Sequence, residues 1–178
     1  DEFRQLVHSG RRVAKARGML RQLRGAVVAP PPGAQEPMRA AFLVRDNLSQ
    51  RRSIERSYVE AIRRARVCVD IAVPYFYPGR SFMRALRQAA RRGVRVRLLL
   101  QGKIDYRIAA LAAQALYDDL RFNGVRIFEY TPAFLHAKVA LVDDDWATVG
   151  SSNIDPLSLL LNLEANLIVR DQAFAAQL

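Results

Sequence analysis

The residues with the clearest chemical potential lie in the stretch FLHAKVALVDDDWATVGSSNID, residues 134–155. His136 and Lys138 stand two positions apart in it, and Ser151 and Asn153 follow after an acidic run. An imidazole can act as a nucleophile or a proton donor, and a lysine ammonium neutralises phosphoryl oxygens. With a serine hydroxyl and an asparagine amide beside them, these groups suit a phosphodiester substrate.

Lysine is a rare choice in this chain, which makes its position informative. Of the 28 basic residues, Lys15, Lys103 and Lys138 are the only lysines, and His8 and His136 are the only histidines. A lone histidine is usually structural, but a histidine beside a scarce lysine and followed by a Gly-Ser-Ser-Asn turn indicates a functional site.

The strand pattern predicts how these side chains come together. Residues 136–142 and 146–153 alternate like strands and are joined directly by acidic residues, so we expect a hairpin with Asp144 and Asp145 as a two-residue loop. Residues directly opposed in a hairpin project from the same face. The expected opposed pairs are Lys138 with Ser151 and His136 with Asn153.

A further strand over residues 161–171 could add a carboxylate to this patch. It places Glu164 on one side together with Asn162 and Asn166. A carboxylate near an imidazole holds it in the right tautomer. Asp143 stays among the catalytic candidates, although its odd spacing of seven residues from His136 favours a structural role in a regular strand.

The acidic run 143–145 also has the composition of a metal site. Three successive carboxylates at a hairpin tip are more typical of a solvated turn, so we expect neither a metal nor another cofactor. A serine hydrolase is disfavoured as well, because the chain lacks a G-x-S-x-G elbow that would activate a serine.

The preceding residues alternate between strand-like and helix-like patterns, which predicts an α/β fold with a mixed, largely parallel sheet flanked by helices on both faces. We expect strands over 38–47, 67–76, 94–102 and 125–130, and helices over 49–66, 81–93 and about 107–123. In such sheets ligands gather at the carboxyl ends of the strands. Those ends carry Tyr75 with Phe76, Lys103 with Asp105, and Glu129 with Tyr130.

Composition bounds the class of protein and of partner. With 178 residues, 51% hydrophobic and 25% charged, the chain has the make-up of a globular protein with one ordinary domain. No run approaches the roughly 20 apolar residues of a transmembrane helix. The net charge of +11 predicts anionic partners, namely nucleic acid, a phospholipid surface or phosphorylated substrates.

Residues 1–37 differ from the rest of the chain. They contain no acidic residue between Phe3 and Gln35, and the segment APPPG breaks any helix. We interpret them as a basic linker or a surface helix on an anionic membrane, and residues 38–178 as the α/β domain. The first residue, Asp1, and the helix-like ending DQAFAAQL suggest a piece of a longer protein.

Several motifs together resemble those of the phospholipase D superfamily. HAKVALVD matches its H-x-K-x(4)-D signature, and GSSNID and NLEANL match its downstream elements. The longer stretches PYFYPGRSFMRALRQAARRGVRVRLLLQGKID and LYDDLRFNGVRIFEY are similar to bacterial cardiolipin synthases, most closely those of the B type. The resemblance covers roughly residues 40–178 and corresponds to the carboxy-terminal half of such an enzyme.

This resemblance implies phosphatidyl transfer through a phosphohistidine. In the family, one motif's histidine attacks the phosphorus of phosphatidylglycerol or a similar lipid, and the other motif's histidine protonates the departing alcohol. A second lipid then resolves the intermediate to cardiolipin. His136 would be one of that pair, Lys138, Ser151 and Asn153 would grip phosphate oxygens, and Glu164 would orient an imidazole.

The resemblance also implies substrate contacts and partners. Tyr75, Phe76 and Lys103 are the candidate substrate-binding residues, with Tyr75 and Phe76 lining a channel. We expect phospholipid substrates and an anionic membrane surface as partners, with the protein peripheral on the cytoplasmic side of a bacterial membrane.

The chain departs from the family in carrying one signature where the active site needs two. His8, in the context HSGRRVAK, has neither the lysine nor the aspartate of the motif. We therefore expect half of a site, completed by an absent amino-terminal half or by a second copy. The chain alone should have little activity.

Two other functions remain open. A superfamily nuclease or phosphodiesterase acting as a homodimer is favoured by the charge of +11. The apolar PLSLLLNL and the aromatic PYFYPG suit acyl chains better, so nucleic acid is disfavoured as a partner. A non-catalytic lipid- or phosphate-binding module, in which the motif is a relic, is the third hypothesis.

Overall fold

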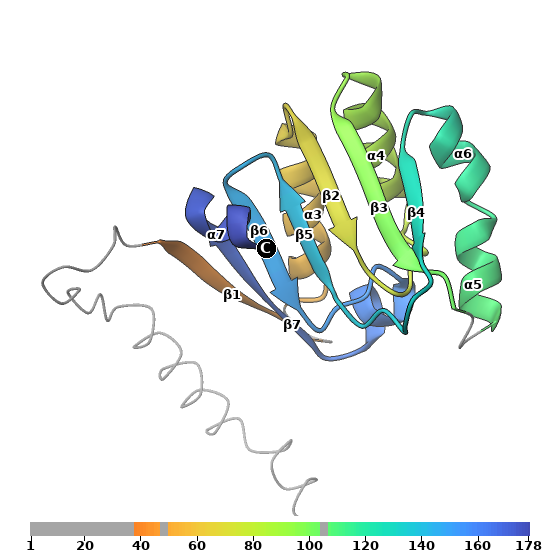
Figure 1. Cartoon of the computed structure of the whole chain (residues 1–178). Coiled ribbons are helices and arrows are strands. Elements are labelled where there is room, and N and C mark those ends of the chain that lie inside the picture. Colours follow the sequence, from red (N-terminus) through yellow and green to blue (C-terminus); the bar gives the residue numbers. More distant parts are fainter. Residues whose placement is uncertain (1–37, 47–49, 104–106) are drawn as a thin grey trace, which may run out of the picture. The chain divides into compact units, whose positions relative to one another are not determined.

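The computed structural model describes residues 38–46, 50–103 and 107–178 (Figure 1). The predictions made for residues 1–37 and for Asp105 lie outside these residues. Met38–Leu178 forms one compact unit. Its elements, in chain order, are β1 (Arg39–Arg45), α3 (Ser53–Arg64), β2 (Cys68–Ala72), α4 (Arg80–Arg91), β3 (Arg95–Gln101), α5 (Arg107–Gln114), α6 (Tyr117–Phe122), β4 (Arg126–Tyr130), β5 (Val139–Val142), β6 (Trp146–Gly150), the π-helix η1 (Leu157–Leu161), β7 (Glu164–Arg170) and α7 (Gln172–Gln177).

The strands of the described residues form a seven-stranded sheet in the order β1-β7-β6-β5-β2-β3-β4. The predicted α/β class with a mixed sheet is confirmed. The expectation of a largely parallel sheet is wrong, because β2–β3 and β3–β4 are parallel whereas the other four neighbouring pairs are antiparallel. A parallel pair needs a crossover connection, and the short connection between β5 and β6 allows only a hairpin.

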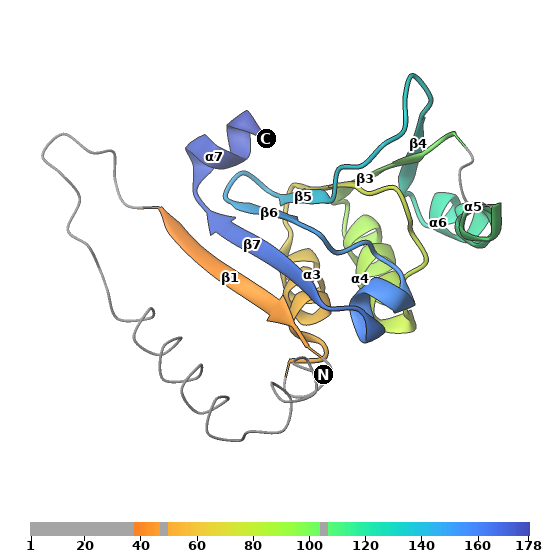
Figure 2. The same ribbon diagram turned by 90° about the horizontal axis from the view of Figure 1, so that it is seen from below.

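Helices α3 and α4 pack side by side on one face of the sheet (Figure 2). Each buries one stripe of apolar side chains at helical spacing, such as Ile54, Tyr58 and Ile62 in α3. The Tyr58 ring contacts those of Phe82 in α4 and Trp146 in β6, with centroids 5.7 and 5.8 Å apart. This layer is the hydrophobic core of the unit, and it holds the strands rigidly in place.

The opposite face of the sheet carries less helix than expected. Among the described residues, α7 is the helix on this side (Figure 2). The prediction of helices on both faces is therefore met on this face by one short helix. Directly paired residues form an apolar row on this face across all the strands, namely Phe42, Leu167, Val149, Val139, Ala72, Leu99 and Phe128.

Glycine ends two of the helices as the sequence predicts. Gly93 after α4 and Gly124 after α6 both have φ of +88°, a conformation that residues with a Cβ rarely adopt. The single helix expected over about 107–123 is instead two helices, α5 and α6, and no glycine or proline marks the break. None of the helices in the described part of the chain has the length and apolarity to cross a bilayer.

Candidate functional site

The described candidate residues other than Asp143 belong to segments at the lower edge of the sheet in Figure 1, which we call the site edge. Strands β1, β2, β3, β4 and β6 end there, and β5 and β7 begin there. The connections at this edge include residues 73–79, 131–138 and 151–163. The parallel arrangement of β2, β3 and β4 therefore brings segments that are distant in the sequence to one place.

His136 and Lys138 lie in the connection that leads into β5. The His136 side chain is exposed, whereas Lys138 is only 8% exposed. The Lys138 ammonium donates to the backbone carbonyl oxygen of His136, with Nζ and O 3.1 Å apart. Burial lowers the pKa of Lys138, and the nearby Glu164 carboxylate opposes this shift. The motif thus pairs an accessible imidazole with a partly desolvated ammonium.

The hairpin differs from the prediction by one residue. Val139 pairs with Val149 and the loop contains the three residues Asp143–Asp145, so Lys138 lies opposite Gly150 rather than Ser151. The predicted pairs of Lys138 with Ser151 and of His136 with Asn153 are therefore wrong. The extra loop residue is Asp143, whose φ of +53° takes it out of the strand.

Asp143 has a structural position, which corrects its place among the catalytic candidates. Its carboxylate accepts the backbone N–H groups of Arg66, Val67 and Cys68 at 3.0, 2.8 and 3.0 Å. Burial works against the charge, but these three donors together hold the pKa of Asp143 below its usual value. The residue follows β5 whereas His136 precedes it, so the two lie at opposite ends of that strand.

Ser151 and Glu164 meet across the ends of β6 and β7. The Ser151 hydroxyl donates to the Glu164 carboxylate and accepts the backbone N–H of Ala165. Asn153, two residues beyond Ser151, is half-buried, and its Oδ1 is buried with no hydrogen-bond partner among the described residues. An acceptor left in this state is a candidate contact for a donor on a bound ligand.

The two aromatic candidates at the end of β2 have different environments. Phe76 is 1% exposed, and its ring packs edge-on against Phe82 at 6.4 Å. Phe76 therefore belongs to the core, and the prediction that it lines a substrate channel is wrong. Tyr75 is half-buried, and its carbonyl accepts the N–H of Ile154, which ties this connection to the segment that carries Asn153.

The end of β3 holds the segment that carries His136. Lys103 is exposed, donates to the carbonyl of Pro132 at 3.0 Å, and lies 6.0 Å from the centroid of the Phe134 ring. Gln101 accepts the N–H of Leu135 through its side-chain oxygen at 2.6 Å. The sequence interpretation missed Gln101, although its position directly before Gly102 and Lys103 at a strand end was a usable signal.

A buried polar pair joins the neighbouring strands β6 and β7. The sequence interpretation identified only one of its two residues. The Asn166 amide donates to the Thr148 hydroxyl at 3.1 Å, and both residues are buried. Asn166 was expected on the same side of its strand as Glu164, but Thr148 was not singled out. The hydrogen bond links β6 to β7 directly beside the site edge, while the buried Oδ1 of Asn166 has no hydrogen-bond partner among the described residues.

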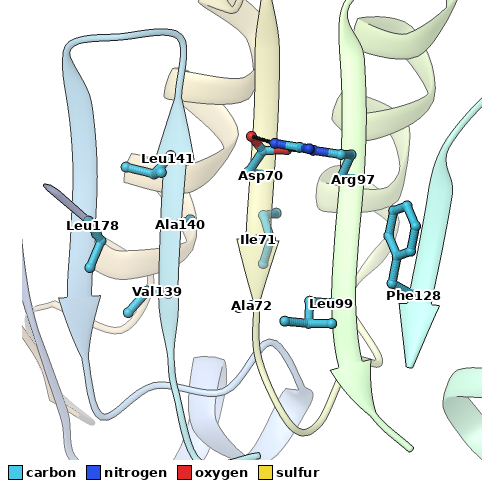
Figure 3. Close-up of a pocket in the computed structure, with 10 residues that line it drawn as sticks. All are labelled: Asp70, Ile71, Ala72, Arg97, Leu99, Phe128, Val139, Ala140, Leu141 and Leu178. Atoms are coloured by element: carbon cyan, nitrogen blue, oxygen red, sulfur yellow. Dashed lines mark hydrogen bonds and ion pairs between the residues drawn. The ribbon is translucent and has the colours of Figure 1, made fainter. Parts of the chain in front are cut away.

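A groove of about 380 Å³ lies away from this cluster, on the face of the sheet that carries α7 (Figure 3). Its lining is mostly apolar and includes Leu99, Phe128 and Leu178, with one ion pair between Asp70 and Arg97. None of the candidate site residues lines it. The groove therefore adds nothing to the chemistry at the site edge.

Comparison with protein families gives a match over residues 58–178 to the model described as cardiolipin synthase, PLD-like domain. Cardiolipin synthase B of Escherichia coli K12 is 53% identical over 142 residues, which are 79% of this chain and 34% of that protein. Cardiolipin synthase A of Pseudomonas fluorescens is 46% identical over 120 residues, 67% of this chain and 25% of that protein. The chain thus spans about a third or less of these relatives.

Among solved structures, the phospholipase D family member Nuc from Salmonella typhimurium superposes with a TM-score of 0.66. The match covers 79% of this chain and 89% of that one, at 20% sequence identity. At this level of identity the likeness concerns the fold alone.

Proposed function

Because the chain belongs to the phospholipase D-like family of cardiolipin synthases, we propose that it supplies half of an active site for phosphatidyl transfer between phospholipids. The product would be cardiolipin, formed through a phosphohistidine. The observation that supports this most directly is the pairing of an exposed His136 with a buried Lys138 whose ammonium is bonded to the His136 carbonyl. A cation held by the backbone of the residue that carries an accessible imidazole suits an anionic phosphorus centre.

In the proposed reaction, His136 acts either as the nucleophile or as the proton donor. As nucleophile, a ring nitrogen forms a bond to phosphorus while the bond from phosphorus to the departing glycerol oxygen breaks. A second histidine, from the complementary half, protonates that oxygen. The hydroxyl of a second lipid then attacks phosphorus, the phosphorus–nitrogen bond breaks, and the second histidine takes up the hydroxyl proton.

The remaining polar residues of the site edge assist this chemistry. Lys138 neutralises charge on the non-bridging oxygens, and its partial desolvation strengthens that interaction. The Asn153 amide donates to a phosphate oxygen through its NH₂ group, with its unpartnered Oδ1 available to a hydroxyl donor, and the Ser151 hydroxyl donates to phosphate once it turns away from Glu164. Glu164, bonded to Ser151, orients a catalytic imidazole.

The proposal includes the partners that a half-site requires. The chain carries one H-x-K-x(4)-D signature, so a complementary half or a second copy of the chain contributes the other histidine. Phosphatidylglycerol or a similar lipid is the donor, and the protein works at the cytoplasmic surface of a bacterial membrane.

The decisive experiment incubates the full-length protein with phosphatidylglycerol vesicles and detects cardiolipin by mass spectrometry. We expect product from the wild type and from His8→Asn, the matched histidine control, and none from His136→Asn. Parallel incubation with DNA separates the alternatives. Cleavage of DNA that depends on His136, without lipid product, would instead identify a nuclease, and lipid binding without any turnover would identify a binding module.

A further inference from the structure

A short segment between Asn153 and Glu164 presents leucines to solvent. Leu157, Leu161 and Leu163 are 59%, 58% and 75% exposed. By contrast, Leu159 is 3% exposed and lies in the core, so the segment is anchored on one side and apolar on the other. Clustered exposed leucines cost free energy in water, and such patches mark interaction surfaces.

The leucines are held outward by a defined backbone. The N–H of Ser158 donates to the Asp155 carboxylate at 3.0 Å, and the N–H of Asn162 donates to the Leu157 carbonyl at 2.7 Å. The guanidinium of the fully buried Arg45, the last residue of β1, donates to the Leu160 carbonyl. The outward side chains are therefore a property of the fold, because the first two bonds hold the shape of the segment and the bond from Arg45 ties it to β1.

Other connections at the site edge extend this surface. Phe134, two residues before His136, is 63% exposed, and Tyr77, in the connection after β2, is also exposed. Exposed cationic side chains lie in the connections at the same edge, namely Arg51 after β1, Arg80 at the start of α4 and Lys103 after β3. Apolar side chains among cations match an anionic bilayer, whose interior is apolar and whose surface is negative.

We propose that the segment Leu157–Leu163 is the membrane-contact element of this protein, and that its exposed leucines enter the headgroup region of an anionic phospholipid bilayer. The inference rests on the proposed function for its substrate, since a bilayer is where the phosphodiester would be found. It adds the surface that brings His136 to the level of the lipid phosphates. Arg51, Arg80 and Lys103 then pair with phosphate groups around the inserted leucines.

The test uses a local probe, because the basic residues 1–37 could hold the chain on vesicles by charge alone. Leu161→Cys is labelled with an environment-sensitive fluorophore, and Phe122→Cys is the matched control. Phe122 is 88% exposed and lies just before β4 begins, at the opposite edge of the sheet. The native Cys68 is buried, and its burial is the main cause of the raised pKa of its thiol. Cys68 therefore reacts slowly, and the label goes to the new, exposed cysteine.

With vesicles of phosphatidylcholine and phosphatidylglycerol, we expect the probe at position 161 to shift to shorter wavelength and to be quenched by brominated acyl chains. The probe at position 122 should do neither. The triple variant Leu157→Ser, Leu161→Ser, Leu163→Ser should bind these vesicles more weakly than the double variant Val67→Gln, Phe122→Gln, by roughly tenfold or more, since it loses several membrane-buried methylene groups.

Two results would overturn the inference. One is a chain that sediments with vesicles while the probe at position 161 stays in water. The other is a spectral shift at position 161 without lipid that grows with protein concentration, which would show that the leucines cover a protein interface.

These readouts are independent of catalysis. His136→Asn should abolish transfer by the full-length protein under the proposed function, yet leave the response of the probe unchanged. If cardiolipin forms without any probe response, the membrane contact is contradicted and the proposed function stands. If the probe responds but the full-length protein transfers no lipid, the proposed function is contradicted and the membrane contact stands.

Discussion

The Lys138 ammonium and the His136 carbonyl oxygen are hydrogen-bonded at 3.1 Å, which ties the motif's cation to the backbone of its own histidine. The lysine is buried and the imidazole is exposed. The motif's charged group is thus buried and its reactive ring is exposed, although the two residues are only two positions apart. The predictions below test what this arrangement and its supports contribute.

Glu164→Gln should lower the pKa of Lys138 further. Burial already lowers it, and the Glu164 carboxylate is the group that opposes this shift. The side-chain carbon signals of labelled lysine can be followed by NMR as pH rises, and with three lysines in the chain the spectrum is simple. Glu60→Gln, which removes a surface ion pair with Arg64, is the control. An unchanged or raised pKa in Glu164→Gln would contradict the placement of the two groups.

Under the proposed function, Lys138→Met should abolish most of the transfer by the protein together with its complementary half, without destabilising the fold. Loss of a fixed cation at a developing phosphorane costs about 100-fold or more in rate. Burial opposes the charge of Lys138 more strongly than the nearby Glu164 supports it, so an apolar side chain of similar length removes a desolvation cost. Cardiolipin formation and urea unfolding would be measured on the same preparation. A variant that remains active would show that Lys138 does not contact the reacting phosphate.

Asp143→Asn should reduce the free energy of unfolding by about 1–3 kcal/mol at neutral pH, the typical cost of weakening a partly buried, charge-assisted hydrogen-bond cluster. Asparagine tolerates the positive φ of this position, so the change isolates the charge.

The effect of Asp143→Asn should depend on pH in a definite direction. The folded-state pKa of Asp143 lies below its usual value, so the stabilisation is complete above the usual carboxyl pKa and is lost as pH falls through the folded pKa. The gap between wild type and variant should therefore close in acid. Asp144→Asn, an exposed neighbour that accepts from Gln172, should change stability by less than about 0.5 kcal/mol. A gap that persists at low pH would contradict this account.

Gly102→Ala should disturb the segment that carries His136. A Cβ at this position would lie 2.8 Å from Cγ2 of Thr131 and 3.0 Å from the Tyr130 carbonyl oxygen, so residues 130 and 131 must adjust. We expect a loss of about 1–3 kcal/mol and a displaced imidazole NMR signal of His136. Gly79→Ala is the control, because its Cβ would approach Glu55 no closer than 3.7 Å. An unchanged His136 signal would mean that β3 does not position this segment.

Local sequence patterns predicted most of the elements because they depend on neighbours in the chain. The helical stripes of α3 and α4, the glycines after α4 and α6, and the alternation in β3 and β7 can all be recognised within a window of several residues. The register of the β5–β6 hairpin could not be predicted in this way. Asp143 leaves the strand with its carboxylate bound to the backbone at 66–68, more than seventy residues earlier.

By itself, the sequence determined that His136, Lys138, Ser151, Asn153 and Glu164 would lie near one end of adjacent strands, because strand periodicity and short connections leave few alternatives. Only the tertiary structure decided which of them reach solvent and which neighbours they keep. Packing against α4 placed Phe76 in the core and not in a channel. Burial of a side chain depends on every element packed around it, and that information is not contained in any single stretch of the chain.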